Sequence, residues 1–223
     1  MHGVNFEHLG PGKGFHITDY PDAERVIAIK GTPAQQLADY ALHQIDLRNA
    51  MQCLDRMGDE VLDEFTRSML WRMAVINYCR CFKNNNARPN NLSVNAYISD
   101  PDGIAAHEYF AALRDKNIAH DDNPLTQCLP GAIVNKSNAA HKIEKVITMS
   151  FLAETYADEN IQNLRQLVSE AQRHVINEYD RLCVQITAEL EVKSHTELMQ
   201  LPQLKYSKPA SESDVKTNRP KHG

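Results

Sequence analysis

The sequence lacks the features of a membrane-spanning or secreted protein. No apolar run approaches the roughly 20 residues that a membrane span requires, and no signal-peptide pattern stands at the N-terminus. The five cysteines are scattered and odd in number, so a disulfide framework is not expected. There is no internal repeat. These absences predict a cytoplasmic protein with reduced thiols.

Motifs for a nucleotide or a metal are also missing. Residues 10–14 read Gly-Pro-Gly-Lys-Gly, but no strand precedes them and Gly-Lys-Ser/Thr is absent, so a plain loop is expected. Cys79 and Cys81 are two apart in a predicted helix, where their side chains point in different directions and make a poor metal clasp. The prediction is a protein with no cofactor and no metal site.

Charge is unevenly distributed along an otherwise ordinary composition. The chain of 223 residues is 42% apolar and 24% charged, which suits one sizeable core or at most two small ones. The net charge is −5, but residues 67–116 hold seven basic and four acidic side chains. A modest basic centre in an acidic protein favours local phosphate binding over coating a long duplex.

Helical periodicity dominates from residue 32 onward. Thr32 and Pro33 form a helix start, and that helix should end near Gly58. A second helix is expected to open at Asp59 and Glu60, where carboxylates suit the positive end of the helix dipole. The apolar residues expected to face the core are, in the first helix, Leu37, Tyr40, Ala41, Ile45 and Leu47, and in the second, Leu62, Phe65, Met69, Met73, Ile76 and Cys79.

The second half of the chain predicts a hairpin and one long helix. Residues 84–91 break the helical pattern, and residues 146–151 are β-prone and could pair with residues 132–134. An apolar stripe then runs through Asp158–Glu191 at spacings of three or four, a helix of about 50 Å that could also serve a partner helix in a homodimer.

The expected organisation has three parts. Residues 1–31 form an N-terminal irregular segment, because they are rich in Gly and Pro and lack a sustained period. Residues 32–200 form one helical domain. Residues 201–223 form a disordered tail, since Ser, Lys, Asp, Pro and Asn dominate from Ser207 onward.

The most informative stretch lies at residues 111–122. Arg114 and His120 bring a permanent cation and a titratable imidazole together near a helix end, where residues 121–124 should stop the helix. Six helical steps place the two side chains about 120° apart around the axis. They can therefore converge on one ligand only if the helix end unwinds or a second copy contributes. Phosphate suits both groups.

An Arg followed by a polar residue and, a few positions later, a His at a helix end resembles the Arg-x4-6-His motif of HEPN domains. The matching residues are Arg114, Asp115 and His120. The resemblance implies an all-α, HEPN-like bundle of four to five helices, here with a small β-hairpin insertion. It also implies a metal-independent endoribonuclease of a toxin or anti-phage defence (abortive-infection) system, with an active site shared across a homodimer.

Chemical roles follow for the residues of the motif. His120 would move protons, Arg114 would stabilise charge on the phosphate, and Asp115 would orient His120 or contact the RNA backbone. The residues expected to assist in RNA binding are Lys116, Asn117, Arg72 and Arg80, although surface ion pairs are an alternative for the last two. Toxin-class HEPN proteins often carry a tyrosine two residues beyond the His. Here that position is Asp122, which casts doubt on regulation at that tyrosine, while an antitoxin or defence partner protein remains an expectation.

Three other interpretations stay open. Arg114 could pair with Asp121 or Asp122 while His120 caps the helix C-terminus, a purely structural role. His120-Asp121 could belong to an HD-type metal-dependent phosphohydrolase that also recruits His107 and Asp180. The chain could also be a non-catalytic HEPN-like module that binds RNA or a protein.

Overall fold

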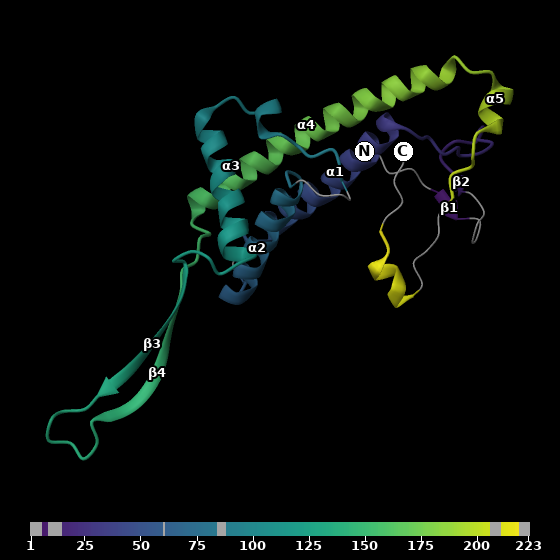
Figure 1. The fold of residues 1–223 in the computed structure, drawn as a ribbon. Coiled ribbons are helices and arrows are strands. Elements are labelled where there is room, and N and C mark those ends of the chain that lie inside the picture. The colour runs from purple at the N-terminus through teal and green to yellow at the C-terminus, as the bar shows by residue number, and fades with distance from the viewer. Residues whose placement is uncertain (1–5, 9–14, 60, 84–87, 206–210, 219–223) are drawn as a thin grey trace. The chain divides into compact units, whose positions relative to one another are not determined.

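The computed structural model describes residues 6–8, 15–59, 61–83, 88–205 and 211–218. The described part is mostly helical, with two antiparallel pairs of strands (Figure 1). The α-helices are α1 (Thr32–Arg56), α2 (Glu64–Arg80), α3 (Pro101–Leu113), α4 (Asp158–Glu191) and α5 (His195–Gln200), and the strands are β1 (Phe6–His8), β2 (Phe15–Ile17), β3 (Thr126–Val134) and β4 (Ile143–Leu152). The prediction of a mainly helical protein with a β-hairpin is therefore confirmed. Among the described helices, none is both long and apolar enough to cross a membrane.

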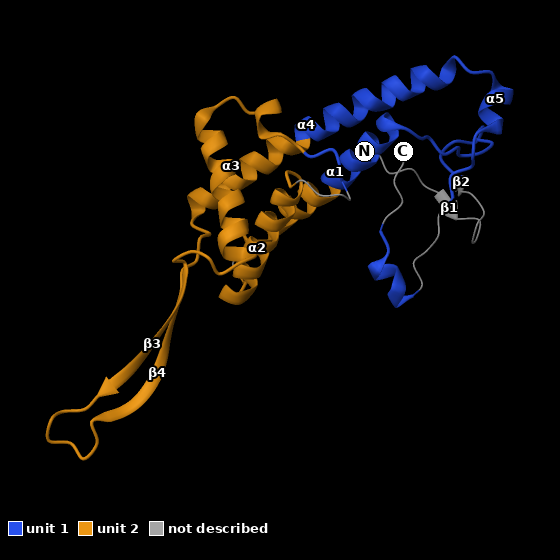
Figure 2. Ribbon diagram, viewed as in Figure 1, with its two compact units in different colours: residues 1–44, 84–91, 173–223 blue, residues 45–83, 92–172 orange. Residues whose placement is uncertain are grey.

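The chain divides into two compact units that alternate along the sequence (Figure 2). Unit 1 comprises residues 1–44, 84–91 and 173–223, and unit 2 comprises residues 45–83 and 92–172. Within unit 1, β1 pairs with β2, and Ile27 forms an antiparallel bridge with Gln203. Segments expected to be irregular at the two ends of the chain therefore carry short pieces of β structure. Of the predicted disordered tail, residues 206–210 and 219–223 lie outside the described residues, and Glu212–Lys216 form a 3-10 turn.

Helix α1 begins where the sequence predicts, but much of the buried face in its first half is polar. Gly31, at φ 93°, precedes the helix in a conformation that glycine adopts readily. Leu47 is buried as expected, whereas Ile45 is 42% exposed. The buried polar residues of α1 lie three or four apart and are Gln35, Asp39, His43 and Asp46. Helical periodicity located the helix, but hydrophobicity alone did not identify which face is covered.

Polar side chains in the part of α1 that belongs to unit 1 bind the segment around Asn90 to this helix. Asp39 accepts hydrogen bonds from the side-chain amide of Gln35 at 2.9 Å and from that of Asn90 at 2.9 Å. The Nε2 of His43 lies 2.7 Å from the carbonyl oxygen of Asn90. Because a carbonyl only accepts, Nε2 carries the proton. Burial of these polar groups is tolerated because they bond to one another and to the backbone.

Helix α2 begins later than predicted and buries a different face. Asp63 caps it by accepting a hydrogen bond from the backbone N–H of Thr66 at 2.8 Å, so the predicted start at Asp59 and Glu60 is wrong. The predicted stripe through Phe65, Met69 and Met73 is exposed. The buried residues are Ser68, Trp71, Ala74, Val75, Asn77, Tyr78 and Cys79. Of the expected core positions in α2, Cys79 alone is buried.

Unit 2 has a dense aromatic and aliphatic core. Trp71 stacks edge-to-face on Phe110 of α3 at 5.8 Å between ring centroids, and its Nε1 donates to the hydroxyl of Thr155 at 2.9 Å. Leu47 and Leu54 of α1 and Leu164 and Val168 of α4 are almost fully buried. Helix α4 has the bounds that the sequence predicts, and its apolar stripe supplies buried side chains from Leu164 to Leu182. Burial also raises the pKa of the Cys79 thiol to about 12, so this free cysteine packs as a neutral group.

Helix α3, which carries the motif, depends on a capping residue. The Asp100 carboxylate accepts from the backbone N–H of Gly103 at 3.2 Å, and Pro101 occupies the first turn. Replacing Asp100 with Ala is expected to lower the free energy of unfolding by about 1 kcal/mol, since the cap is lost. Urea unfolding followed by circular dichroism measures this loss. Asp100→Asn keeps an acceptor and serves as the control, and equal losses in both variants would contradict a capping role.

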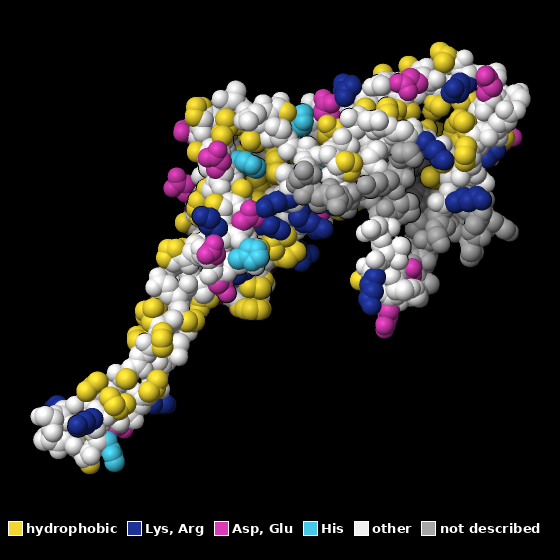
Figure 3. Space-filling view, viewed as in Figure 1, with side chains coloured by type: hydrophobic (Ala, Val, Ile, Leu, Met, Phe, Trp, Pro, Cys, Tyr) yellow, Lys and Arg dark blue, Asp and Glu magenta, His cyan; other side chains and the backbone are white. Residues whose placement is uncertain are grey.

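Strands β3 and β4 form a long two-stranded ribbon. Ala132 pairs with Val146 and Ile133 with Lys145, so the predicted hairpin is confirmed, and it is longer than expected. Almost all of its side chains are exposed, and Figure 3 shows many apolar ones along it. By alternation of the register, one face carries Leu129, Ile133, Ile147, Met149 and Phe151. Two-stranded ribbons are only marginally stable alone in water.

Candidate functional site

The helix that carries the motif changes its winding at Arg114. Residues Arg114–Ile118 form a π-helical turn, closed by a hydrogen bond from the N–H of Ala119 to the carbonyl of Arg114 at 2.9 Å. A second hydrogen bond spans six residues, from the N–H of Asp122 to the carbonyl of Lys116 at 2.8 Å. Single π turns are uncommon and occur often at functional sites. The helix end therefore unwinds within the motif.

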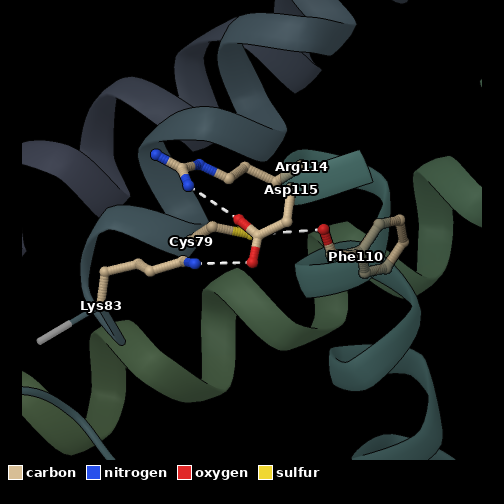
Figure 4. A network of polar contacts seen from close by, with 5 residues as sticks. All are labelled: Cys79, Lys83, Phe110, Arg114 and Asp115. Carbon is tan, nitrogen blue, oxygen red and sulfur yellow. Dashed lines mark hydrogen bonds and ion pairs between the residues drawn. The ribbon is translucent and has the colours of Figure 1, made fainter. Parts of the chain in front are cut away.

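Arg114 belongs to a three-residue charge network (Figure 4). Its Nη1 donates to Oδ1 of Asp115 at 2.7 Å, and the Nζ of Lys83 donates to Oδ2 of the same carboxylate at 2.6 Å. Hydrogen bonds from Lys83 and then from Arg114 hold the pKa of Asp115 below its ordinary value. The ion pair of Arg114 thus runs to Asp115 rather than to Asp121 or Asp122, so that part of the structural interpretation is wrong.

His120 lies just beyond the π turn and is exposed. Among the described residues it has no hydrogen-bond, ion-pair or ring partner. It is therefore not part of the Arg114–Asp115–Lys83 network, and Asp115 does not orient it by a hydrogen bond. Its imidazole is accessible to a ligand from solvent.

The predicted RNA-binding residues have different environments. Lys116 is exposed, whereas Asn117 is 7% exposed. The Asn117 amide donates to Oδ1 of Asn123 at 3.3 Å and lies 3.4 Å from the hydroxyl of Thr126. These contacts tie the π turn to the first residue of the ribbon. The buried amide of Asn117 therefore holds this loop in place.

The two arginines of α2 also differ. Arg80 lies 3.5 Å from the carboxylate of Asp46, which is buried in α1. Arg80 therefore balances the buried carboxylate of Asp46. This ion pair is the alternative to RNA binding that the sequence analysis gave for Arg80. Arg72 is half-buried and has no hydrogen-bond or ion-pair partner in the described part of the chain, so its guanidinium remains available for an anion.

Lys83 is the site residue that sequence reasoning missed. It follows α2 by three residues and is 31 positions from Arg114 in the sequence. Its only sequence signal was membership of the basic region 67–116, a signal that it shared with six other residues. The packing of α2 against α3, through contacts such as that of the Cys79 thiol with the carbonyl of Phe110 at 3.5 Å, accounts for the meeting of Lys83 and Asp115.

An HD-type phosphohydrolase requires a cluster of metal-binding side chains, which would include His107. The Nδ1 of His107 is hydrogen-bonded to the hydroxyl of Tyr78 at 2.8 Å, and its ring packs on Phe82 at 4.5 Å. Burial lowers the pKa of His107. In the described ranges, no group of three or more His, Cys, Asp or Glu side chains is placed to hold a metal ion. His107 is therefore a packed aromatic residue of the core edge.

Unit 2 also contains a cleft whose charged lining residues are all acidic. It has a volume of about 510 Å³ and lies between the start of α3 and the first half of α4. Its charged lining residues are Asp100, Asp102, Glu159 and Glu170. These carboxylates repel phosphate, so this cleft does not suit an anionic ligand.

Comparison of the chain with protein-family models, with curated proteins and with solved structures finds no match. Membership of a family is therefore not shown. The resemblance to HEPN domains rests on three residues of the motif, Arg114, Asp115 and His120, and on their place at the end of a helix in a mainly helical chain.

Proposed function

We propose that this protein is a metal-independent endoribonuclease of HEPN type. The observation that carries the proposal is the π turn at the end of α3, which presents Arg114 and, two residues after the turn, an exposed His120. A fixed cation and an accessible imidazole are the two groups that RNA cleavage without a metal requires. The mostly helical architecture is consistent with a HEPN-like bundle.

The proposed reaction uses the nucleophile that RNA itself supplies. The 2′-oxygen attacks the adjacent phosphorus while a neutral imidazole takes the 2′-hydroxyl proton. The bond from phosphorus to the 5′-oxygen breaks, and a protonated imidazole gives that oxygen a proton. The products are a 2′,3′-cyclic phosphate and a 5′-hydroxyl. Arg114 stabilises the charge that develops on the phosphate oxygens without changing its own protonation state.

One His120 cannot easily serve both sides of the phosphorus. A homodimer that places two copies of His120 and Arg114 along one groove supplies both the acid and the base. The exposed position of His120 leaves it accessible to a second copy. In a cell, such an activity suits a toxin or anti-phage effector that is held inactive by an antitoxin or defence partner.

The chemistry predicts a sharp dependence on the 2′-hydroxyl. The purified protein is expected to cut a single-stranded RNA in the presence of a chelator and to leave the same sequence intact as DNA or as 2′-O-methyl RNA, because both lack the nucleophile. Denaturing gels measure the cutting, and mass spectrometry identifies cyclic phosphate ends. Cleavage of the DNA strand, or activity abolished by the chelator, would argue against this mechanism and toward a metal-dependent one.

A second candidate function is a non-catalytic binding module. The exposed apolar face of the ribbon, which carries Leu129, Met149 and Phe151, favours it because such faces usually contact another protein. RNA bound by the purified dimer but never cut, under all the conditions above, would support this alternative and oppose the endoribonuclease.

A further inference from the structure

Two cations from different elements share one carboxylate at the start of the π turn. Lys83 follows α2, and Arg114 begins the turn after α3. Both bond to Asp115, one to each oxygen, at 2.6 and 2.7 Å. The side chains of Lys83 and Arg114 are 45% and 31% exposed. The formal charges of these three side chains sum to +1, and both cations are partly exposed to solvent.

The Nε and Nη2 edge of the Arg114 guanidinium makes no hydrogen bond to the described residues. The one hydrogen bond of this guanidinium within the described residues uses Nη1, and Figure 4 shows the opposite side of the group directed away from Asp115. The Nε and Nη2 donors of an arginine form a planar fork that matches two oxygens of a phosphate. Asp115 thus occupies one side of the guanidinium and leaves the fork for a ligand.

Asp115 also allows the two cations to lie close together. Lys83 and Arg114 each lie within 2.7 Å of its carboxylate, and without that negative charge they would repel each other. The low pKa of Asp115 keeps the carboxylate charged at neutral pH. Surface ion pairs contribute little to stability, so the value of this arrangement lies in positioning.

We propose that Lys83 and Arg114 form a two-cation site for the RNA phosphodiester backbone, with Asp115 as the residue that positions both. This inference rests on the endoribonuclease function proposed above and adds Lys83 as an RNA-binding residue. Arg114 binds the phosphate that reacts. Lys83 binds the same strand beside it and contributes to affinity rather than to the chemical step.

The binding test uses a strand that cannot be cut. A single-stranded 2′-O-methyl oligonucleotide is titrated with wild type, Lys83→Ala, Lys83→Arg and, as a matched control, Lys136→Ala from the loop between the ribbon strands. Lys83→Ala is expected to raise Kd about 10-fold and to reduce the slope of log Kd against log salt by about 0.7. Lys83→Arg and Lys136→Ala are expected to bind like wild type. Equal Kd and slope in Lys83→Ala and wild type overturn the inference, as does a wild type that does not bind the strand.

The positioning test separates affinity from catalysis. Asp115→Asn is expected to lower kcat for RNA cleavage about 10- to 100-fold, because Arg114 loses its orientation, while the uncut strand binds as tightly as before or more tightly, because a negative charge is gone. Asp115→Glu should recover part of kcat. Weaker binding with unchanged kcat would refute the role. A wild type that binds the 2′-O-methyl strand with the predicted Lys83 dependence, but never cuts RNA, refutes the endoribonuclease and leaves the two-cation site standing.

Discussion

Replacing His120 with Ala is expected to lower kcat for RNA cleavage by about 10²- to 10⁴-fold, the usual effect of removing a general acid or base. KM should change little, because His120 has no hydrogen bond or ion pair with the described residues and does not hold the Arg114 network in place. Arg114→Ala is expected to lower kcat by about 10²- to 10³-fold, the typical cost of removing a group that stabilises the developing oxyanion. It should also raise KM, since the same group binds the ground-state phosphate.

Initial rates on one oligonucleotide, measured from pH 5 to 9, provide the readout. One neutral and one protonated imidazole in the same dimer predict a bell-shaped profile, and His120→Ala should remove it. His141→Ala is a matched control, because His141 is also exposed and lies in the loop between β3 and β4. Full activity in His120→Ala would exclude the proposed mechanism. A loss in His141→Ala as large as in His120→Ala would show that the effect is not specific to the motif.

The sequence was sufficient to place the motif near the end of a helix, but not to predict which residues surround it. The spacing of Arg114 and His120 and the helix stop after them are local properties, and the structure has a helix that ends at this point. The π winding could not be predicted, because it depends on contacts such as those of the buried Asn117 amide with Asn123 and Thr126. The pairing of Lys83 with Asp115 depends on how α2 packs on α3, a nonlocal fact.

The same contrast holds for the helices. The bounds of α4 followed from periodicity because its apolar residues form one uninterrupted stripe. In α1, polar Asp39 and His43 occupy the buried face and bond to Asn90 across 47 or more residues, so apolar spacing could not identify that face. In α2, both faces carry apolar residues, and the stripe through Phe65 and Met69, which periodicity predicts to be buried, is exposed.

Replacing Trp71 with Ala is therefore expected to be among the most damaging substitutions in the chain. Trp71 is 1% exposed, stacks on Phe110 and donates to Thr155. A buried Trp replaced by Ala typically costs about 3–5 kcal/mol in the free energy of unfolding. Trp71→Phe keeps an aromatic ring and loses the hydrogen bond, so a smaller cost of about 1–3 kcal/mol is expected. Urea unfolding followed by circular dichroism measures both.

Phe65→Ala is the matched control, because it removes an aromatic ring from the same helix at a position that is 72% exposed. Its effect is expected to stay within about 0.5 kcal/mol, as for most surface substitutions. If α2 instead buried the stripe that the sequence suggests, the order would reverse, and Phe65→Ala would cost several times more than Trp71→Ala. The comparison thus decides which face of α2 packs in the core, and with it the helix orientation that places Lys83 beside Asp115.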